Sequence, residues 1–200
     1  MKINIYNDKG LRKTTPKIWQ EFFANHSEFT IEFTEAEDIL RGHPDAILFP
    51  GGSASVFARK LGKKRRKKIV KWVAEGGTYI GVCAGAYLAS QTYEWSLGIS
   101  PIIVSRNWRK GHHTVKISLS DNDHYVDYFN GPTCESWSDV EVLASFPEGI
   151  PGFQSTINTP AIIKNNWESG KVFLVSPHLE KNKSTLDVLY DLLQKVIRDK

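Results

Sequence analysis

The hydrophobic pattern in the first half of the chain switches repeatedly between the period of a strand and the period of a helix. Apolar runs or alternation typical of strands occupy residues 2–6, 29–33, 46–49 and 79–82. Helical spacing of apolar residues follows Thr14, over residues 14–23, and recurs over residues 60–75. Strands that alternate with helices predict βαβ winding and a mostly parallel sheet.

Strand patterns dominate the second half of the chain. They predict strands at residues 102–104, 115–119, 125–129 and 140–146, and a hairpin at residues 161–164 and 171–176. A final helix is expected from about Ser184. No repeat or low-complexity linker divides the chain. We therefore expect residues 1–200 to form a single α/β domain, with helices on both faces of the sheet and an added β-rich segment over about residues 100–165.

Composition narrows the class of protein. The chain has 200 residues and is 40% hydrophobic, which is enough for a large core. No apolar run approaches the ~18 residues of a membrane span, and residues 1–6 lack an apolar signal region. We therefore expect a cytoplasmic protein without a membrane segment. Cys83 and Cys134 are the only cysteines, which argues against a disulfide scaffold.

Much of the net charge of +4 comes from consecutive cations at Lys63 to Lys68. Such a run near a helix N-terminus opposes the helix dipole. One interpretation is a nucleic-acid or nuclear-import segment, and the other is a solvated helix face above Ile69, Trp72 and Val73. No aromatic platform or nucleic-acid motif accompanies the run, so we favour the solvated face and expect no nucleic-acid partner.

The most specific local signal lies at residues 78–89. The apolar run 79–82 leads into Cys83, and the small residues Ala84, Gly85 and Ala86 follow before a helix begins. A sharp strand-to-helix turn crowds the backbone, so only small residues fit beside a side chain lifted above the sheet. The N-terminus of the following helix favours the thiolate. Cys83 is therefore a candidate nucleophile, and the alternative is a small buried side chain in the core.

A second candidate group follows the late strand, where residues 176–180 read Ser-Pro-His-Leu-Glu. In extended chain, residues two apart project to the same side, so His178 and Glu180 can meet. The carboxylate would then orient the imidazole, and the imidazole would act as a base toward a thiol. The alternative is a pair of solvated side chains in a loop ahead of the final helix.

Taken together, these segments resemble the class I glutamine amidotransferase-like superfamily, and most closely its biotin–protein ligase N-terminal domain group. The resemblance spans residues 46–180, and four motifs carry it: Phe49-Pro50-Gly51-Gly52, Gly81-Val82-Cys83-Ala84-Gly85-Ala86-Tyr87, Tyr128-Phe129-Asn130-Gly131-Pro132 and Ser176-Pro177-His178-Leu179-Glu180. The resemblance implies a flavodoxin-like, doubly wound α/β fold.

The resemblance also implies roles for individual residues. It assigns Cys83 as nucleophile, His178 as base and Glu180 as the group that orients the base. It places oxyanion donors at the amides of Ala84 and Gly52. The substrate-binding candidates that it implies are Gly51, Ser53, Tyr87 and Asn130. For Asn130, a structural Asn-Gly turn is the favoured alternative.

The same resemblance places Cys134 near Cys83. We interpret Cys134 as a buried thiol that takes no part in the reaction, and the alternative is a resolving thiol for redox control. His112, His113 and His124 match no zinc spacing and are interpreted as surface or packing side chains. No cofactor and no metal are expected.

Ala86 and Tyr87 stand where glutamine-hydrolysing members carry bulky polar residues. The resemblance therefore supports the hydrolytic machinery better than it supports glutamine as the substrate. One expected function is a Cys-His-Glu hydrolase or amidotransferase-like enzyme that cleaves the C–N bond of a small amide or peptide through a thioester. The alternative is a catalytically weak regulatory or binding module, related to the N-terminal domain of biotin–protein ligase, that works with a separate ligase or synthetase.

Overall fold

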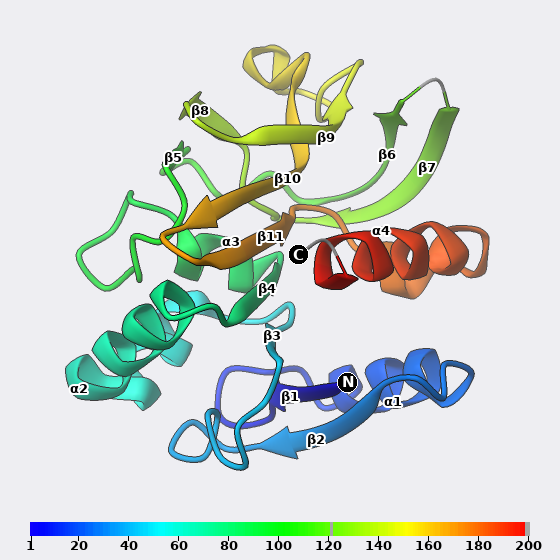
Figure 1. The fold of residues 1–200 in the computed structure, drawn as a ribbon. Helices are drawn as coiled ribbons and strands as arrows, with labels where there is room; N and C mark the ends of the chain where they lie inside the picture. Colours follow the sequence, from blue (N-terminus) through cyan, green and yellow to red (C-terminus); the bar gives the residue numbers. More distant parts are fainter. Residues whose placement is uncertain (121, 199–200) are drawn as a thin grey trace.

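The computed structural model describes residues 1–120 and 122–198, and Figure 1 shows how its elements are arranged. The strands are β1 (Lys2–Tyr6), β2 (Thr30–Thr34), β3 (Ala46–Phe49), β4 (Thr78–Val82), β5 (Ile102–Val104), β6 (His112–Leu119), β7 (Asn122–Phe129), β8 (Cys134–Trp137), β9 (Glu141–Phe146), β10 (Thr159–Trp167) and β11 (Gly170–Val175). The helices are α1 (Thr15–Ala24), α2 (Ala54–Ala74), α3 (Ala84–Ala89) and α4 (Leu186–Arg198). Short 3₁₀ turns lie at Gln154–Thr156, Leu179–Lys181 and Lys183–Thr185.

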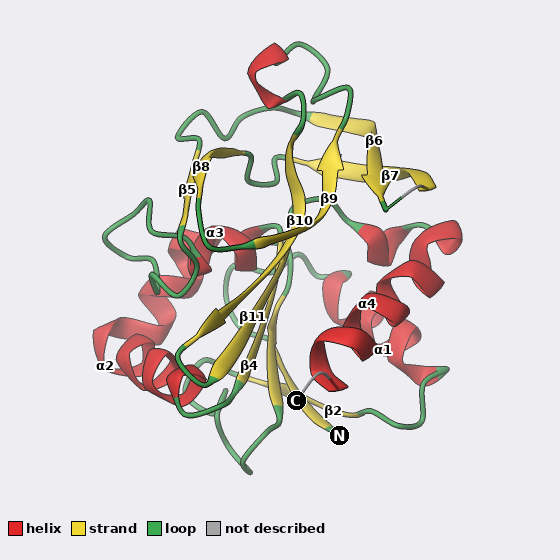
Figure 2. Cartoon of the chain, turned by 45° about the horizontal axis from the view of Figure 1, so that its top comes forward, coloured by secondary structure: helices red, strands yellow, loops and turns green. Residues whose placement is uncertain are grey.

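Within the described residues, a nine-stranded sheet has the order β2-β1-β3-β4-β11-β10-β9-β6-β7. Strands β2, β1, β3, β4 and β11 are neighbours in the sheet and pair in parallel. Beyond β11, the strands β10, β9, β6 and β7 extend the sheet with antiparallel pairing. A separate ribbon joins β5 to β8. Helices α1 and α4 cover one face of the sheet, and α2 and α3 cover the other (Figure 2). The expected doubly wound α/β fold with a β-rich extension is confirmed.

Alternate residues of the buried strands point into two hydrophobic cores. On β3, Ala46 and Leu48 join the core that contains residues of α1 and α4, whereas Ile47 and Phe49 join the core that contains residues of α2. Every residue of β3 and β4 is buried, as expected for parallel strands that are covered on both faces. This burial holds in place the carboxyl ends of the strands, where ligands bind in such sheets.

Two elements differ most from the prediction, while strands β6, β7 and β10 are only longer than expected. Helix α2 begins at Ala54, whereas the sequence pattern placed its start at residue 60. Gly62 interrupts the helix with φ 65° and ψ 167°, a conformation that glycine adopts without the penalty that a Cβ brings. This kink breaks the helical periodicity of the apolar residues, so the sequence pattern did not predict the first turns of α2. Strand β8 was missed because only its first residue, Cys134, is buried, so no alternation marks it.

The basic run lies on α2 above the buried side chains of Ile69 and Val73. Its two arginines are half-buried and make specific contacts. Arg65 pairs with Glu37 at 3.6 Å, and Arg66 donates to the carbonyl of Trp95 at 2.8 Å. The run therefore includes a tether between α2 and the loop that follows α3.

Candidate active site

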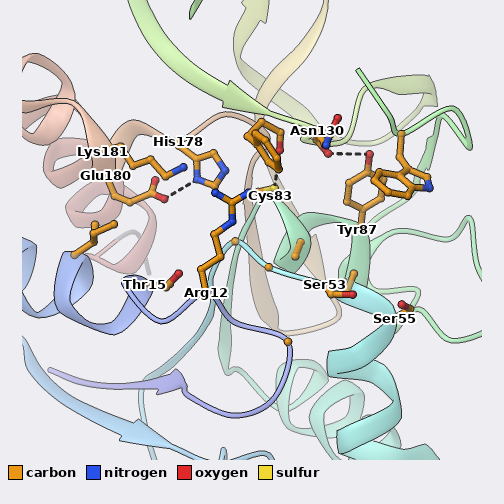
Figure 3. A pocket seen from close by; sticks show the side chains of 18 of the residues that line it. Arg12, Thr15, Ser53, Ser55, Cys83, Tyr87, Asn130, His178, Glu180 and Lys181 are labelled. Carbon is orange, nitrogen blue, oxygen red and sulfur yellow. Dashed lines mark hydrogen bonds and ion pairs between the residues drawn. The ribbon is translucent and has the colours of Figure 1, made fainter. Parts of the chain in front are cut away.

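A cavity of about 680 Å³ opens at the carboxyl ends of β3, β4 and β11 (Figure 3). Its volume lies within the range of about 300–1,000 Å³ that is usual for small-molecule sites. Every site residue expected from the sequence lines it, although these residues come from four separate segments of the chain: Gly51, Gly52, Ser53, Cys83, Ala84, Tyr87, Asn130, His178 and Glu180. The fold therefore brings the whole predicted set to one place.

Cys83 occupies a strained turn between β4 and α3. Its φ is 49° and its ψ is −97°, a combination that non-glycine residues rarely adopt. The backbone is held there by a hydrogen bond from the Cys83 amide to the carbonyl of Val175, at 2.8 Å. The turn also depends on a close approach at Gly85, where a Cβ would lie 2.0 Å from the carbonyl oxygen of Phe49. The turn is thus imposed by packing, and it presents the thiol to the cavity.

His178 and Glu180 form a buried pair at the end of β11. The imidazole Nδ1 lies 2.7 Å from Oε1 of Glu180, and the two residues are 5% and 7% exposed. The backbone amide of His178 donates to the carbonyl of Asp127 at 2.7 Å, which anchors the residue. Gly51 lets the β3 loop approach the ring, since a Cβ at that position would lie 2.6 Å from Cε1 of His178. The imidazole is therefore fixed from three sides.

The charge of the His178 ring depends on its neighbours. Burial opposes protonation of the imidazole, but the negative charge of Glu180 and the hydrogen bond and charge of Cys83 outweigh burial and raise the pKa of His178 to about 10. These contacts favour the imidazolium form of the ring, which lies between a carboxylate and the thiol group. This arrangement can donate a proton to a leaving group.

Two backbone amides border the cavity beside Cys83. Ala84 is the first residue of α3, so its N–H has no acceptor within the helix. Gly52 is exposed to the cavity, and the loop after β1 packs against it. The backbone amide of Ser53 donates to the carbonyl of Gly10 in that loop at 3.0 Å. A Cβ at Gly52 would lie 2.5 Å from that carbonyl. Glycine is therefore needed where the two loops meet.

Tyr87 and Asn130 hold the wall opposite His178 in place. The hydroxyl of Tyr87 lies 3.3 Å from the carbonyl oxygens of both Asn130 and Gly131, and burial raises its pKa well above the usual range. Asn130 has a φ of 51°, and its side-chain oxygen accepts from the amide of Gly111 at 2.7 Å. These contacts match the structural Asn-Gly turn that was the alternative for Asn130.

Two further parts of the cavity were not predicted from the sequence. One is Arg12, in the loop after β1. The other is a group of aromatic and cationic side chains in the loops between α3 and β6, which we call the loop wall: Tyr93, Trp95, Arg106 and Trp108. Tyr93 and Trp95 stack at 4.5 Å with 8° between their planes, and Arg106 lies 5.2 Å from the Tyr93 ring. They belong to no motif and reach the cavity only through tertiary contacts.

Cys134 is buried in the core on the α2 side of the sheet and does not line the cavity. Burial raises the pKa of its thiol to about 12, so the thiol stays neutral. His112 is exposed and contacts the carboxylate of Asp127, while Nε2 of His113 lies 2.6 Å from the carbonyl of Lys110.

Within residues 1–120 and 122–198, no group of three or more His, Cys, Asp or Glu side chains could hold a metal ion. No helix in the same part of the chain is long and apolar enough to cross a membrane.

Comparison of the sequence with protein families finds a match to the family described as biotin–protein ligase, N terminal, over residues 1–109. The chain is also 25% identical to an uncharacterized protein of Chlamydia muridarum, over 90% of this chain and 80% of that protein. The family match includes Cys83 and the Gly51–Gly52 loop, and it ends before His178.

Comparison of the structure with solved structures identifies the fold. A crystal structure of a glutamine amidotransferase matches with a TM-score of 0.70 and 18% identity, over 98% of both chains. A protein of Thermoplasma acidophilum, described as a putative GMP synthase component, matches with a TM-score of 0.63 and 14% identity, over 98% of both chains. The fold is therefore that of the class I glutamine amidotransferase-like proteins.

Proposed function

The chain belongs to the biotin–protein ligase N-terminal family, and we propose that it acts as a cysteine-dependent hydrolase of a C–N amide bond. Cys83 is the nucleophile, His178 the general acid and base, and Glu180 the group that orients His178. The amides of Ala84 and Gly52 are the proposed oxyanion donors. The substrate is a small amide or peptide.

The observation that carries this proposal is the buried His178–Glu180 pair beside the strained turn of Cys83. Holding a non-glycine residue at φ 49° costs on the order of 1–3 kcal/mol, and such strain persists where the surroundings enforce it. The imidazole is held at 2.7 Å by a carboxylate that is itself buried. A thiol, an oriented imidazole and a carboxylate in this order are the parts of a nucleophilic triad.

In the first half of the reaction, the Cys83 thiolate attacks the carbonyl carbon of the amide and forms a C–S bond. The negative charge moves to the carbonyl oxygen, next to the amides of Ala84 and Gly52. A donor of this kind contributes about 2.7–4 kcal/mol to the transition state. The His178 imidazolium then gives its proton to the amine nitrogen, the C–N bond breaks, and a thioester remains.

In the second half, neutral His178 takes a proton from water as the water oxygen attacks the thioester. The C–S bond breaks, the electron pair returns to Cys83, and a carboxylic acid is released. Glu180 keeps the same imidazole nitrogen occupied throughout, so the other ring nitrogen faces the reacting atoms. The cycle ends with the thiolate and imidazolium that began it.

The test is the rate of alkylation by iodoacetamide at neutral pH, followed by peptide mass spectrometry. We expect Cys83 to react at least tenfold faster than Cys134, because Cys134 is a buried neutral thiol. Labelling of the protein by a panel of thiol-reactive amide analogues should be lost in Cys83→Ala and kept in Cys134→Ala. If the two thiols react equally slowly and the panel labels Cys83→Ala as it labels the wild type, the proposal is wrong.

A second candidate function is a binding or regulatory module that works with a separate ligase or synthetase. The observation that favours it is the extent of the family match, which ends at residue 109 and so leaves out His178 and Glu180. This function predicts a stable complex with a partner enzyme that Cys83→Ala leaves intact. Size-exclusion chromatography of wild type and Cys83→Ala with a biotin–protein ligase catalytic domain would test it, and loss of the complex in Cys83→Ala would contradict it.

A further inference from the structure

Arg12 differs from the other cationic side chains of the cavity. Each of the others is held by an oxygen atom: Lys181 by Asp127 at 3.2 Å, Arg106 by the carbonyl of Thr92 at 2.9 Å and His178 by Glu180 at 2.7 Å. No carboxylate of residues 1–120 or 122–198 forms an ion pair with Arg12. Its guanidinium instead lies 4.2 Å from the centroid of the Phe129 ring.

The backbone places Arg12 next to the proposed nucleophile. Leu11 forms an antiparallel bridge with Gly52, so the loop that carries Arg12 lies against the loop that carries a proposed oxyanion donor. The residue beneath the guanidinium, Phe129, also touches the thiol, since its carbonyl oxygen lies 3.6 Å from Sγ of Cys83. In Figure 3 the side chain of Arg12 rises from its loop toward His178 and Cys83.

Stacking on a ring face holds a guanidinium in place without using its N–H groups. The attraction acts through the π face of the ring, and the edges of the planar group remain free to donate. Two parallel N–H groups match the two oxygens of a carboxylate. Each of the other cationic side chains of the cavity already contacts an oxygen atom of the protein, so Arg12 is the one placed to receive an anion from the ligand.

We propose that Arg12 binds a carboxylate of the substrate, so that the amides cleaved at Cys83 are those that carry a carboxylate near the reacting carbonyl. This inference rests on the proposed function only in taking Cys83 as the reactive thiol. It adds a substrate class that neither the family match nor the fold specifies. The carboxylate lies on the side of the cavity formed by the loop after β1, away from the loop wall.

The experiment measures alkylation of Cys83 by matched acid and carboxamide reagents. The acids are iodoacetate, N-iodoacetylglycine and N-iodoacetyl-β-alanine, which place the carboxylate at increasing distance, and each is compared with its own carboxamide. Every acid-to-carboxamide rate ratio is divided by the same ratio for free cysteine. For at least one pair we expect the wild-type ratio to exceed that of free cysteine by about tenfold, the effect of one additional charge pair.

Arg12→Gln should remove this preference, and Arg12→Lys should restore part of it. Lys13→Gln is the matched control, because it removes the same charge from the adjacent exposed residue, which does not line the cavity. The inference is overturned if no acid is preferred, if the preference survives Arg12→Gln, or if Lys13→Gln lowers it equally. It is also overturned if Arg12→Gln slows acids and carboxamides alike, since Arg12 would then act on the thiol. Failure of iodoacetamide itself to label Cys83 would contradict the proposed function instead.

Discussion

The two sides of the cavity are built by different means. One side, which we call the strand-end wall, consists of residues 51–53, 83–84, 178 and 180, which follow three neighbouring parallel strands. Cys83 and His178 are 6% and 5% exposed. The loop wall, by contrast, stands on irregular chain, and its Trp108 is 45% exposed. The proposed chemistry therefore lies on a buried wall that the parallel strands support, whereas the loop wall offers an exposed surface of aromatic and cationic side chains.

The largest effect should come from filling the close approach behind the strand-end wall. A Cβ at Gly85 would lie 2.0 Å from a backbone oxygen of β3, so Gly85→Ala must displace a buried strand. We expect a loss of about 3 kcal/mol or more in the free energy of unfolding, measured in urea. Gly98, in the loop after α3, is the matched control: its φ is 71°, but apart from its two chain neighbours no atom of the described residues lies within 4 Å of an added Cβ. Gly98→Ala should cost about 1 kcal/mol, and equal losses for the two variants would remove the contrast between the walls.

The strand-end wall should also make stability depend on pH. Because the pKa of His178 is raised to about 10 from 6.5, the folded state holds a proton that the unfolded state releases. The resulting stabilisation is fully present below pH 6.5 and is lost as the pH rises toward 10. Urea unfolding at pH 6.5 and pH 8.5 should therefore show falling stability in the wild type. His178→Asn and Glu180→Gln should both flatten this fall, and an unchanged slope in His178→Asn would contradict the ion pair.

The loop wall should affect which alkylating reagent Cys83 prefers, and it should leave the intrinsic reactivity of the thiol unchanged. The stacked rings of Tyr93 and Trp95 offer a planar apolar surface. Trp95→Ala should lower the preference of Cys83 for N-phenyliodoacetamide over iodoacetamide by about fivefold, the contribution of one aromatic contact. The rate with iodoacetamide alone should stay the same. Trp137→Ala removes an exposed tryptophan outside the cavity and should leave both rates unchanged. A drop in both rates for Trp95→Ala would show that the walls are not independent.

The smallest effect concerns the basic run that supports the loop wall. Arg66→Gln removes the hydrogen bond of 2.8 Å to the carbonyl of Trp95 and should cost about 1 kcal/mol. Lys67 is exposed and lies next to it, so Lys67→Gln should change stability by no more than about 0.5 kcal/mol. Urea denaturation of the two variants gives the comparison. Equal values would mean that the tether contributes nothing.

The strand-end wall and the loop wall also differ in how well the sequence predicted them. The strand-end wall was foreseen because its signals are local: a buried apolar run, small residues around Cys83, and a histidine and glutamate two apart. The loop wall and Arg12 were not foreseen, because aromatic residues and arginines in loops carry no periodicity. Helix α2 was only partly foreseen, since Gly62 breaks its pattern.

The sequence by itself determined which segments are buried strands and therefore where their ends must lie, because a strand covered on both faces has to be apolar along its length. It also determined the order of thiol, histidine and glutamate along the chain. Only the tertiary structure decided what faces them. Contacts between distant segments, such as the bridge from Leu11 to Gly52 and the hydrogen bond from His178 to Asp127, bring Arg12 and β7 to the cavity. Such contacts depend on the packing of the whole sheet, which no local pattern encodes.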